Sequence, residues 1–489
     1  MRTSGVLMHI SSLPSNYGIG TLGHEAYNFV DFLVKAGQTY WQILPICPTS
    51  YGDSPYQTFS SFAGNPYFID LDMLIQDGLL KKSECENIKW SEYDTSVDYK
   101  LMYENRFKVL KKAYNRFVNS VPSGFEQFCK EQDYWLHDYA LFMAIKNDTG
   151  ENWNNWKKEL KLRYNDALEN YKEKHNSEVN FHKVVQYLFY SQWQKLKRYA
   201  NNNNIKIIGD LPIYVAVDSV DVWANPELFV LNSDYEPTYV AGCPPDSFSE
   251  LGQRWGNPLY DWNKMKQDDY AWWVRRLNHI TKIYDVTRID HFRGFDSYYS
   301  IDAREKTAKI GVWEKGPGIE FFSSIKNQMG TLDIIAEDLG FLTPSVHKLL
   351  KDTGFPGMKI LQFAFDSRED NEYLPHNYTQ NSVVYTGTHD NDTIIGWINN
   401  ASKQEVECAT EYLHLTGNEE YNWEMMKAAW ECVSDTAIVT MQDLLGLDSD
   451  SRMNIPSTIG VNWKWRMNKQ STDGLAKKIN KYMKAYKRG

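Results

Sequence analysis

Residues Val286–Phe295 read VTRIDHFRGF, and this stretch decides how the rest of the chain is interpreted. Its first half is typical of a buried strand, and the apolar character stops at Asp290 and His291. Because side chains alternate along a strand, Arg288 and Asp290 point to the same face, and the guanidinium is expected to keep the carboxylate ionised at neutral pH. Such a carboxylate can act as a nucleophile or a base. The alternative is a structural ion pair that closes the strand.

The overall composition narrows the classes of partner. The chain has 489 residues, with 53 Lys and Arg against 63 Asp and Glu, and a formal net charge of -10. No long basic run interrupts this acidic balance, which argues against nucleic acid and anionic membranes as partners. The start lacks a basic segment followed by an apolar one, and no apolar run approaches the roughly 20 residues of a membrane helix. We expect a soluble protein that stays in the cytoplasm.

Two residue classes add to this picture. The six cysteines are scattered with no CxxC pair, so we expect reduced thiols and neither a disulfide framework nor a zinc site. The 17 Trp, 32 Tyr and 22 Phe are many, and several stand beside Gly, Pro or Asp. Most of these rings are expected to serve packing, but aromatic faces beside polar groups also suit a sugar ligand.

Strands and helices alternate along the chain. A strand at Ser4–Ile10, a helix at His24–Lys35 and a strand at Tyr40–Leu44 form one strand–helix–strand unit of a parallel α/β fold. A long helix at about Glu178–Ala200 leads to a strand ending at Asp210. Further strands are predicted at Leu332–Ala336, Met358–Gln362 and Ser382–Thr386. About eight such units make a (β/α)8 TIM barrel the economical fold, with residues 1–489 as one catalytic unit.

Two insertions interrupt the predicted barrel. Residues 68–175 are polar and mainly helical, and we assign no chemistry to them. Residues 217–262 form a second, loop-rich insertion beside the predicted site, and Asp218–Gly256 is expected to be irregular because it is rich in Pro, Trp and Gly. The basic segment Gly474–Arg488 is predicted to be a closing helix whose charges form a solvated face.

Asp290, Glu337 and Asp390 each follow a predicted apolar strand. In a barrel of this kind the active site lies at the carboxyl ends of the strands, so closure would bring the three acids together. Cleavage of a glycoside with retention needs two carboxyls about 5 Å apart, one ionised and one protonated. Asp290 suits the ionised role. Glu337 has apolar neighbours and the acidic Asp338 beside it, which should raise its pKa and keep its proton.

Asp390 could then hold sugar hydroxyls and repel charge from Glu337. Each acid alone could instead be a structural cap or an ion-pair partner at a strand end. A metal site is a further alternative, because His291 and His389 could join the carboxylates as ligands. No HxxxH or HxH spacing supports a metal site.

Seven blocks of sequence, in order, carry a resemblance to a known family. The chain resembles the 4-α-glucanotransferases (amylomaltase or disproportionating enzyme, glycoside hydrolase family 77) from Gly5 to about Arg466. The blocks are HISSLPSNYGIGTLG (His9–Gly23), SYGDSPYQTFSSFAGNPY (Ser50–Tyr67), GDLPIYVA (Gly209–Ala216), GCPPDSFSELGQRWGNPLYDW (Gly242–Trp262), RIDHFRGF (Arg288–Phe295), AEDLG (Ala336–Gly340) and GTHDNDT (Gly387–Thr393).

The resemblance implies a retaining double displacement on α-1,4-glucans such as maltodextrin, starch or glycogen, with no metal or organic cofactor. Asp290 is similar to the family's nucleophile, Glu337 to its general acid and base, and Asp390 to the stabiliser of the distorted ring. The hydrogen-bonding groups around the donor sugar would be Asp210, Arg288, His291 and His389. Tyr56 would be the stacking platform for the sugar, and the loop covering the acceptor side would contain Asp246, Phe248 and Trp255.

This chain departs from some relatives at Ser247, where they have an aromatic residue, which affects the acceptor side and not the chemistry. Two rival functions remain open. A starch hydrolase would use the same three acids with a more open acceptor side, and it would generate new reducing ends. A catalytically silent glucan-binding protein would bind without turnover, but it would have no reason to keep all three acids.

Overall fold

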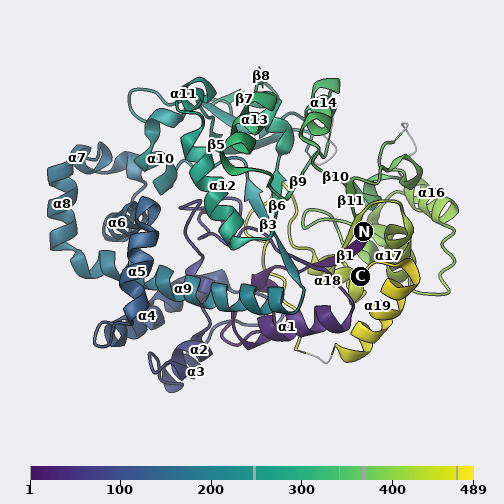
Figure 1. The fold of residues 1–489 in the computed structure, drawn as a ribbon, viewed down its shortest axis with the longest axis horizontal. Coiled ribbons are helices and arrows are strands. Elements are labelled where there is room, and N and C mark those ends of the chain that lie inside the picture. The colour runs from purple at the N-terminus through teal and green to yellow at the C-terminus, as the bar shows by residue number, and fades with distance from the viewer. Residues whose placement is uncertain (1, 246–248, 341, 366–370, 470–471) are drawn as a thin grey trace.

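Eight parallel strands close into a barrel in the order β1-β12-β11-β10-β9-β6-β3-β2 (Figure 1). The computed structural model describes residues 2–245, 249–340, 342–365, 371–469 and 472–489. The barrel strands are β1 (Thr3–Leu7), β2 (Tyr40–Gln42), β3 (Lys206–Pro212), β6 (Val286–Asp290), β9 (Ile334–Ala336), β10 (Gly357–Ile360), β11 (Ser382–Tyr385) and β12 (Thr436–Thr440). The predicted (β/α)8 barrel is therefore confirmed.

Amphipathic helices cover the outside of the barrel. In α1 (His24–Lys35), Phe29, Val30 and Leu33 are buried, and the chain turns after the helix at Gly37, whose φ is +70°. The other covering helices are α9 (Asn176–Asn202), α12 (Ala271–Ile283), α13 (Gly318–Met329), α14 (Pro344–Thr353), α15 (Ile394–Asn400), α16 (Lys403–Leu413), α17 (Tyr421–Glu431), α18 (Met441–Leu444) and α19 (Asp473–Tyr486). The helix at His24–Lys35 matches its prediction residue for residue.

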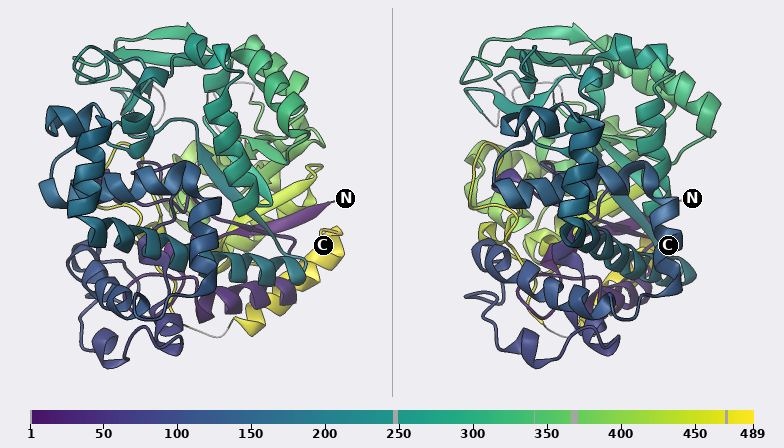
Figure 2. Two further views of the ribbon diagram at one scale, coloured as in Figure 1. Left: turned by 60° about the vertical axis from the view of Figure 1, so that its left-hand side comes forward. Right: turned by 90° about the vertical axis from the view of Figure 1, so that its left-hand side faces the viewer.

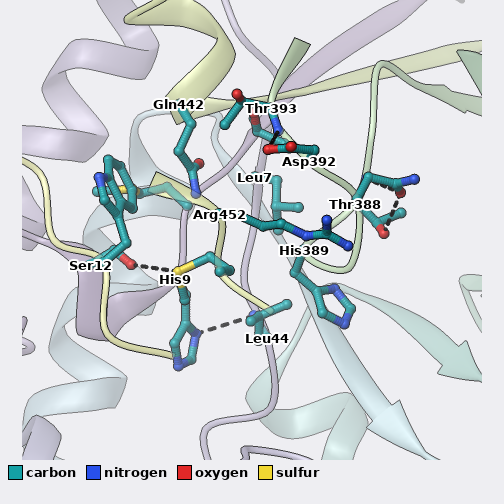
Figure 3. Close-up of a pocket in the computed structure, with 15 residues that line it drawn as sticks. Leu7, His9, Ser12, Leu44, Thr388, His389, Asp392, Thr393, Gln442 and Arg452 are labelled. Carbon is teal, nitrogen blue, oxygen red and sulfur yellow. Dashed lines mark hydrogen bonds between the residues drawn. The ribbon is translucent and has the colours of Figure 1, made fainter. Parts of the chain in front are cut away.

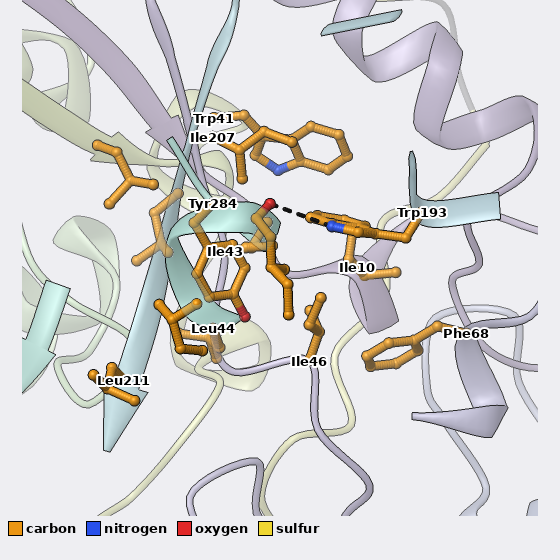
Figure 4. Packing of buried hydrophobic residues seen from close by; sticks show 14 of the residues in the cluster. Ile10, Trp41, Ile43, Leu44, Ile46, Phe68, Trp193, Ile207, Leu211 and Tyr284 are labelled. Atoms are coloured by element: carbon orange, nitrogen blue, oxygen red, sulfur yellow. Dashed lines mark hydrogen bonds between the residues drawn. The ribbon is translucent and has the colours of Figure 1, made fainter. Parts of the chain in front are cut away.

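Aromatic and aliphatic side chains pack together in the buried core (Figure 4). Trp41 of β2, Trp193 of α9 and Tyr284 are buried together. A Cβ at Gly209 would lie 2.1 Å from the ring of Tyr284, so β3 needs glycine at this position. The ring of Tyr284 thus packs directly against the strand, one residue before Asp210.

The helical insertion lies between β2 and α9, and it flanks the barrel on the left and lower left of Figure 1. Its helices are α2 (Leu71–Gln76), α3 (Ser83–Glu86), α4 (Tyr99–Phe117), α5 (Ser123–Glu131), α6 (Asp133–Thr149), α7 (Lys158–Lys161) and α8 (Asn165–Lys174). Arg106 of α4 is fully buried and donates hydrogen bonds to the carbonyls of Tyr67 and Ile69. It therefore ties the insertion to the connection that follows β2.

A second sheet stands above the barrel in Figure 1, with four antiparallel strands in the order β5-β4-β7-β8. Its strands are β4 (Tyr239–Cys243), β5 (Gln253–Pro258), β7 (Ser297–Asp302) and β8 (Val312–Lys315), and the short helices α10 (Val220–Ala224) and α11 (Trp262–Gln267) flank β4 and β5 in sequence. The prediction that Asp218–Gly256 is irregular is therefore wrong for β4 and β5. β4 pairs with β5 on one side and, on the other, with β7, which comes from beyond β6, and such distant pairing leaves little local signal.

The two chain termini lie close together at the base of the barrel in every view (Figure 2). Arg488 follows α19 and is 0% exposed; it donates to the carbonyls of Thr3, Cys432 and Ser434. The predicted solvated face is therefore wrong for this residue, because its guanidinium satisfies carbonyls beneath the barrel. Within the described part of the chain, no helix is long and apolar enough to cross a bilayer.

Candidate active site

Asp290 and Glu337 leave adjacent strands side by side. Ile289 of β6 pairs with Ala336 of β9, so the next residue of each strand, Asp290 and Glu337, emerges at the same edge. Neighbouring strands lie about 4.8 Å apart, a spacing that suits a pair of carboxyls acting on one glycosidic bond. The backbone of His291 turns with φ at +53°, and its N–H donates to Oε2 of Glu337 over 2.7 Å. A non-glycine residue in this conformation is uncommon and is typical of functional turns.

Arg288 forms ion pairs with two acids of this cluster, Asp210 and Asp290. Its Nη1 donates to both oxygens of Asp210 over 2.8 Å and lies 3.0 Å from Oδ1 of Asp290. Asp210 and Arg288 face each other in the β3–β6 register, and both side chains are almost fully buried. The hydroxyl of Tyr56 donates to Oδ2 of Asp210 over 2.7 Å. The predicted Arg288–Asp290 pair exists, but Asp210 shares the guanidinium.

The pKa of Asp290 reflects its burial as well as its ion pair with Arg288. Burial raises its pKa to about 8, Arg288 opposes the shift, and the carboxylates of Asp210 and Glu337 add to it. Arg288 therefore favours the ionised form of Asp290, as predicted, but burial and the neighbouring carboxylates oppose this effect. The physical reason is that one guanidinium serves several carboxylates in a poorly solvated space.

Glu337 also has a raised pKa, as the sequence predicted. Burial is the main cause, while Arg288 and the N–H groups of Leu339 and His291 oppose it. These two N–H groups donate to Oε1 and Oε2 over 2.8 Å and 2.7 Å, so the carboxyl is fixed in orientation. Two raised pKa values on adjacent acids mean that the pair retains a proton more readily than ordinary carboxyls do.

Asp390 lies in the loop after β11, on the far side of β10 from Glu337. The three acids therefore do not follow three successive barrel strands. The side chain of Asp390 is 41% exposed, and His389 Nε2 lies 3.4 Å from its Oδ1. The side-chain amide of Asn454 donates to the same oxygen over 2.6 Å. Asp390 is thus more open than Asp290, whose side chain is 29% exposed.

Aromatic rings border the acids. Tyr56 stacks on His389 with ring centroids 5.1 Å apart and an interplanar angle of 17°, and Trp463 lies 5.9 Å from Tyr56. Trp255 meets His291 edge to face at 4.8 Å. Burial lowers the pKa of His291 to about 3 and also lowers the pKa of His389, so both imidazoles are neutral near pH 7.

A small cavity of about 20 Å³ lies behind His389 and is lined in part by His9, Gln442 and Arg452 (Figure 3). This volume suits a single water molecule. The amide N–H of Leu44 donates to Nδ1 of His9, and burial lowers the pKa of His9 to about 3. Figure 3 also shows the guanidinium of Arg452 pointing toward the loop that carries His389.

The structure gathers nine of the eleven predicted site residues around this cluster. They are Tyr56, Asp210, Trp255, Arg288, Asp290, His291, Glu337, His389 and Asp390. Asp246 and Phe248, as well as Ser247, lie outside the described residues. Within the described part, no group of three His, Cys, Asp or Glu side chains is arranged to hold a metal ion.

Sequence reasoning missed Arg452, Asn454 and Trp463, which contact Asp390, His389 and Tyr56. They follow β12, a strand that the sequence did not reveal. The segment RMNIPSTIGVNWKWR (Arg452–Arg466) has the Pro, Gly and Trp density of an ordered loop, which was the available signal.

Comparison with known proteins agrees with this geometry. The family model described as 4-alpha-glucanotransferase, of glycoside hydrolase family 77, matches residues 8–472. A 4-alpha-glucanotransferase from Clostridium butyricum is 52% identical over 485 residues, covering 98% of this chain and 100% of the relative. One from Streptococcus pneumoniae is 52% identical over 476 residues, covering 95% and 93%.

Among solved structures, the amylomaltase from Streptococcus agalactiae in complex with acarbose is similar over 100% of both chains, with a TM-score of 0.97 and 45% identity. The amylomaltase from Corynebacterium glutamicum shares the fold, with a TM-score of 0.78 at 17% identity over 98% of this chain and 75% of that one. The extent of the family match and the identity over nearly the whole length lead to one conclusion: the chain belongs to the 4-α-glucanotransferase family, glycoside hydrolase family 77.

Proposed function

We propose that this protein is a 4-α-glucanotransferase that cuts an α-1,4-glucosidic bond and passes the held segment to the 4-hydroxyl of another glucan. The observation that carries the proposal is the β6–β9 register, which sets Asp290 beside Glu337 at one edge of the barrel. Arg288, which pairs with Asp290, and Asp390, which Asn454 hydrogen-bonds, complete the site around the acid pair Asp290 and Glu337. Membership of the family supports the same activity.

In the first step, Glu337 donates its proton to the glycosidic oxygen while a carboxylate oxygen of Asp290 attacks the anomeric carbon. The glycosidic bond breaks, the reducing-end portion leaves as an alcohol, and an ester links the retained segment to Asp290. The raised pKa of Glu337 suits a group that must arrive protonated. Arg288, whose Nη1 lies 3.0 Å from Oδ1 of Asp290, favours the ionised form of Asp290 that attacks.

In the second step, the Glu337 carboxylate accepts the proton of the acceptor's 4-hydroxyl, whose oxygen attacks the anomeric carbon. The ester bond breaks, Asp290 is released as a carboxylate, and two inversions give net retention. The fixed orientation of Glu337 by two backbone N–H groups suits this exchange of roles. Asp390 faces the same space and is proposed to stabilise the distorted sugar ring through its hydroxyls.

The remaining predicted residues have supporting roles in the proposal. Asp210, Arg288, His291 and His389 would hydrogen-bond the donor sugar, and Tyr56 would stack on it. The acceptor side would be formed by Asp246, Phe248 and Trp255. Transfer must exceed hydrolysis, so this side has to position an acceptor sugar and exclude water. The proposed substrates are maltodextrin, starch or glycogen-type glucans, without a cofactor. The scattered cysteines, with no CxxC pair, support the proposed cytoplasmic location.

Incubation of the pure protein with maltotriose tests the proposal. Transfer predicts glucose and a ladder of longer maltodextrins at a constant total of reducing ends, because each bond cut is replaced by a bond formed. Shorter products with rising reducing ends would contradict transfer and favour a hydrolase that uses the same acids. Binding without turnover would contradict both enzymatic functions.

The pH dependence of kcat/KM follows from the two raised pKa values. This parameter reports groups of the free enzyme, in which burial raises the pKa of Asp290 to about 8. Activity should fall as the pH decreases because the nucleophile becomes protonated, and it should fall at alkaline pH because Glu337 loses its proton. We expect a bell-shaped profile whose acid limb lies well above about 3.9, the ordinary pKa of an aspartate. Initial rates with maltotriose measure it; an acid limb at or below about 4 would contradict the account.

A further inference from the structure

The loop that carries Asp390 is held from outside by a second segment of the chain. β11 ends at Tyr385, so Asp390 is not fixed by the strand ladder. Inside the loop, the N–H of Asp390 donates to Oγ1 of Thr388 over 3.3 Å, and that hydroxyl donates to Asn391 over 2.9 Å. These local bonds shape the loop, but they do not set the direction of the Asp390 carboxyl.

The second segment is Arg452–Asn454, which follows the 3₁₀ turn η9 (Ser449–Ser451). Arg452 donates through Nη2 to the carbonyl of Asp390 and through Nε to the carbonyl of Asn454 over 2.8 Å. The backbone N–H of Asn454 donates to the carbonyl of His389 over 3.0 Å. Its side-chain amide donates to Oδ1 of Asp390 over 2.6 Å. Asn454 therefore forms hydrogen bonds to two consecutive residues of the loop, His389 and Asp390.

The contact leaves one oxygen of Asp390 for a ligand. Asn454 Nδ2 and His389 Nε2 both approach Oδ1 of Asp390. Among the described residues, none donates a hydrogen bond to Oδ2. A neutral amide orients the carboxylate without cancelling its charge, whereas a lysine or arginine at this position would neutralise it. A carboxylate oriented through one oxygen can present the other to a sugar hydroxyl with little reorganisation in the transition state.

We propose that Asn454 is a positioning residue that orients Asp390 through Oδ1 and so presents Oδ2 to hydroxyls of the sugar held at the reaction centre. Asn454 acts on the reaction only through Asp390. The inference rests on the proposed function, since it assigns a role in the transfer reaction. It gives the loop after β12 a role in the reaction although that loop supplies none of the three acids.

The test is Asn454→Ala, which removes the amide and keeps the backbone bond to His389. Because Asp390 acts on the distorted ring, kcat for maltotriose should fall by about 100-fold, the scale of a misplaced catalytic group. KM should change by no more than about 3-fold, because ground-state sugar contacts remain. The matched control is Asn400→Ala, which removes a hydrogen bond to Ser449 beside the same segment without touching Asp390. It should keep normal kcat, and thermal unfolding should show both variants folded.

A double-mutant cycle separates positioning from a general effect on the loop. In an Asp390→Ala background, with glucosyl fluoride as donor, adding Asn454→Ala should cause no further loss, because the group to be positioned is gone. A further loss of the full size, an unchanged kcat in Asn454→Ala, or an equal loss in Asn400→Ala would overturn the inference. Wild-type protein is assayed first with maltotriose, so absence of transfer there would count against the proposed function and not against Asn454.

Discussion

Replacing Asp290 with asparagine should abolish glucan transfer while leaving glucan binding measurable. The amide has the shape of the carboxyl but cannot form an ester with the anomeric carbon, so the double displacement loses its intermediate. Removal of a nucleophile of this kind costs roughly 10⁴-fold or more in kcat. Transfer is measured as glucose released from maltotriose, and binding by isothermal titration with a longer maltodextrin.

The matched control for this variant is Asp296→Asn. Asp296 lies in the same segment, and its carboxylate accepts from the hydroxyls of Ser297 and Ser345 near the surface. This control should transfer glucan at close to the normal rate. Near-normal turnover by Asp290→Asn would show that Asp290 is not the nucleophile. The fold and the family assignment would not be affected by this result.

Replacing Glu337 with glutamine should slow the reaction of donors with poor leaving groups far more than that of donors with good ones. A glucan leaving group needs a proton as its bond breaks, and loss of general acid catalysis costs about 10²-fold to 10⁴-fold. Fluoride leaves without a proton, so the first-turnover release of fluoride from glucosyl fluoride should stay near the normal rate. Stopped-flow measurement of fluoride and steady-state release of glucose from maltotriose give the two rates.

Equal losses on the two donors would contradict the role of Glu337 as the acid. The control is Glu320→Gln on α13, away from the site. It alters an exposed ion pair between Glu320 and Lys266. It should leave both rates unchanged.

The barrel could be predicted because its strands are short apolar runs that end in charged residues. At Val286–Asp290 the strand periodicity stops where Asp290 appears, and β6 has those bounds. β12 (Thr436–Thr440) escaped prediction because it stands among helices in an apolar region that lacks a clear period. The antiparallel sheet as a whole escaped for another reason: its two halves, β5–β4 and β7–β8, join through β4 and β7 across the intervening β6, and such distant partners leave no local pattern.

The site residues that could be predicted are likewise those that follow recognisable strands. Asp290 and Glu337 could be located because they follow recognisable strands, and their proximity followed from barrel closure. The sharing of Arg288 with Asp210 could not be predicted, since it depends on the β3–β6 register. Burial is the main cause that raises the pKa of Asp290, and the carboxylate of Asp210 adds to it. Asn454 was missed because it lies in a loop after an unpredicted strand.

The central claim is a covalent ester between Asp290 and the transferred segment, and trapping that ester tests it most directly. In Glu337→Gln the second step is slowed because no base activates the acceptor, so glucosyl fluoride should load the enzyme and the intermediate should accumulate. Mass spectrometry of the intact protein should show the added mass of one anhydroglucose, and peptide sequencing should place it on Asp290. The account would be contradicted if fluoride were released rapidly but no adduct formed, or if the adduct were found on another residue.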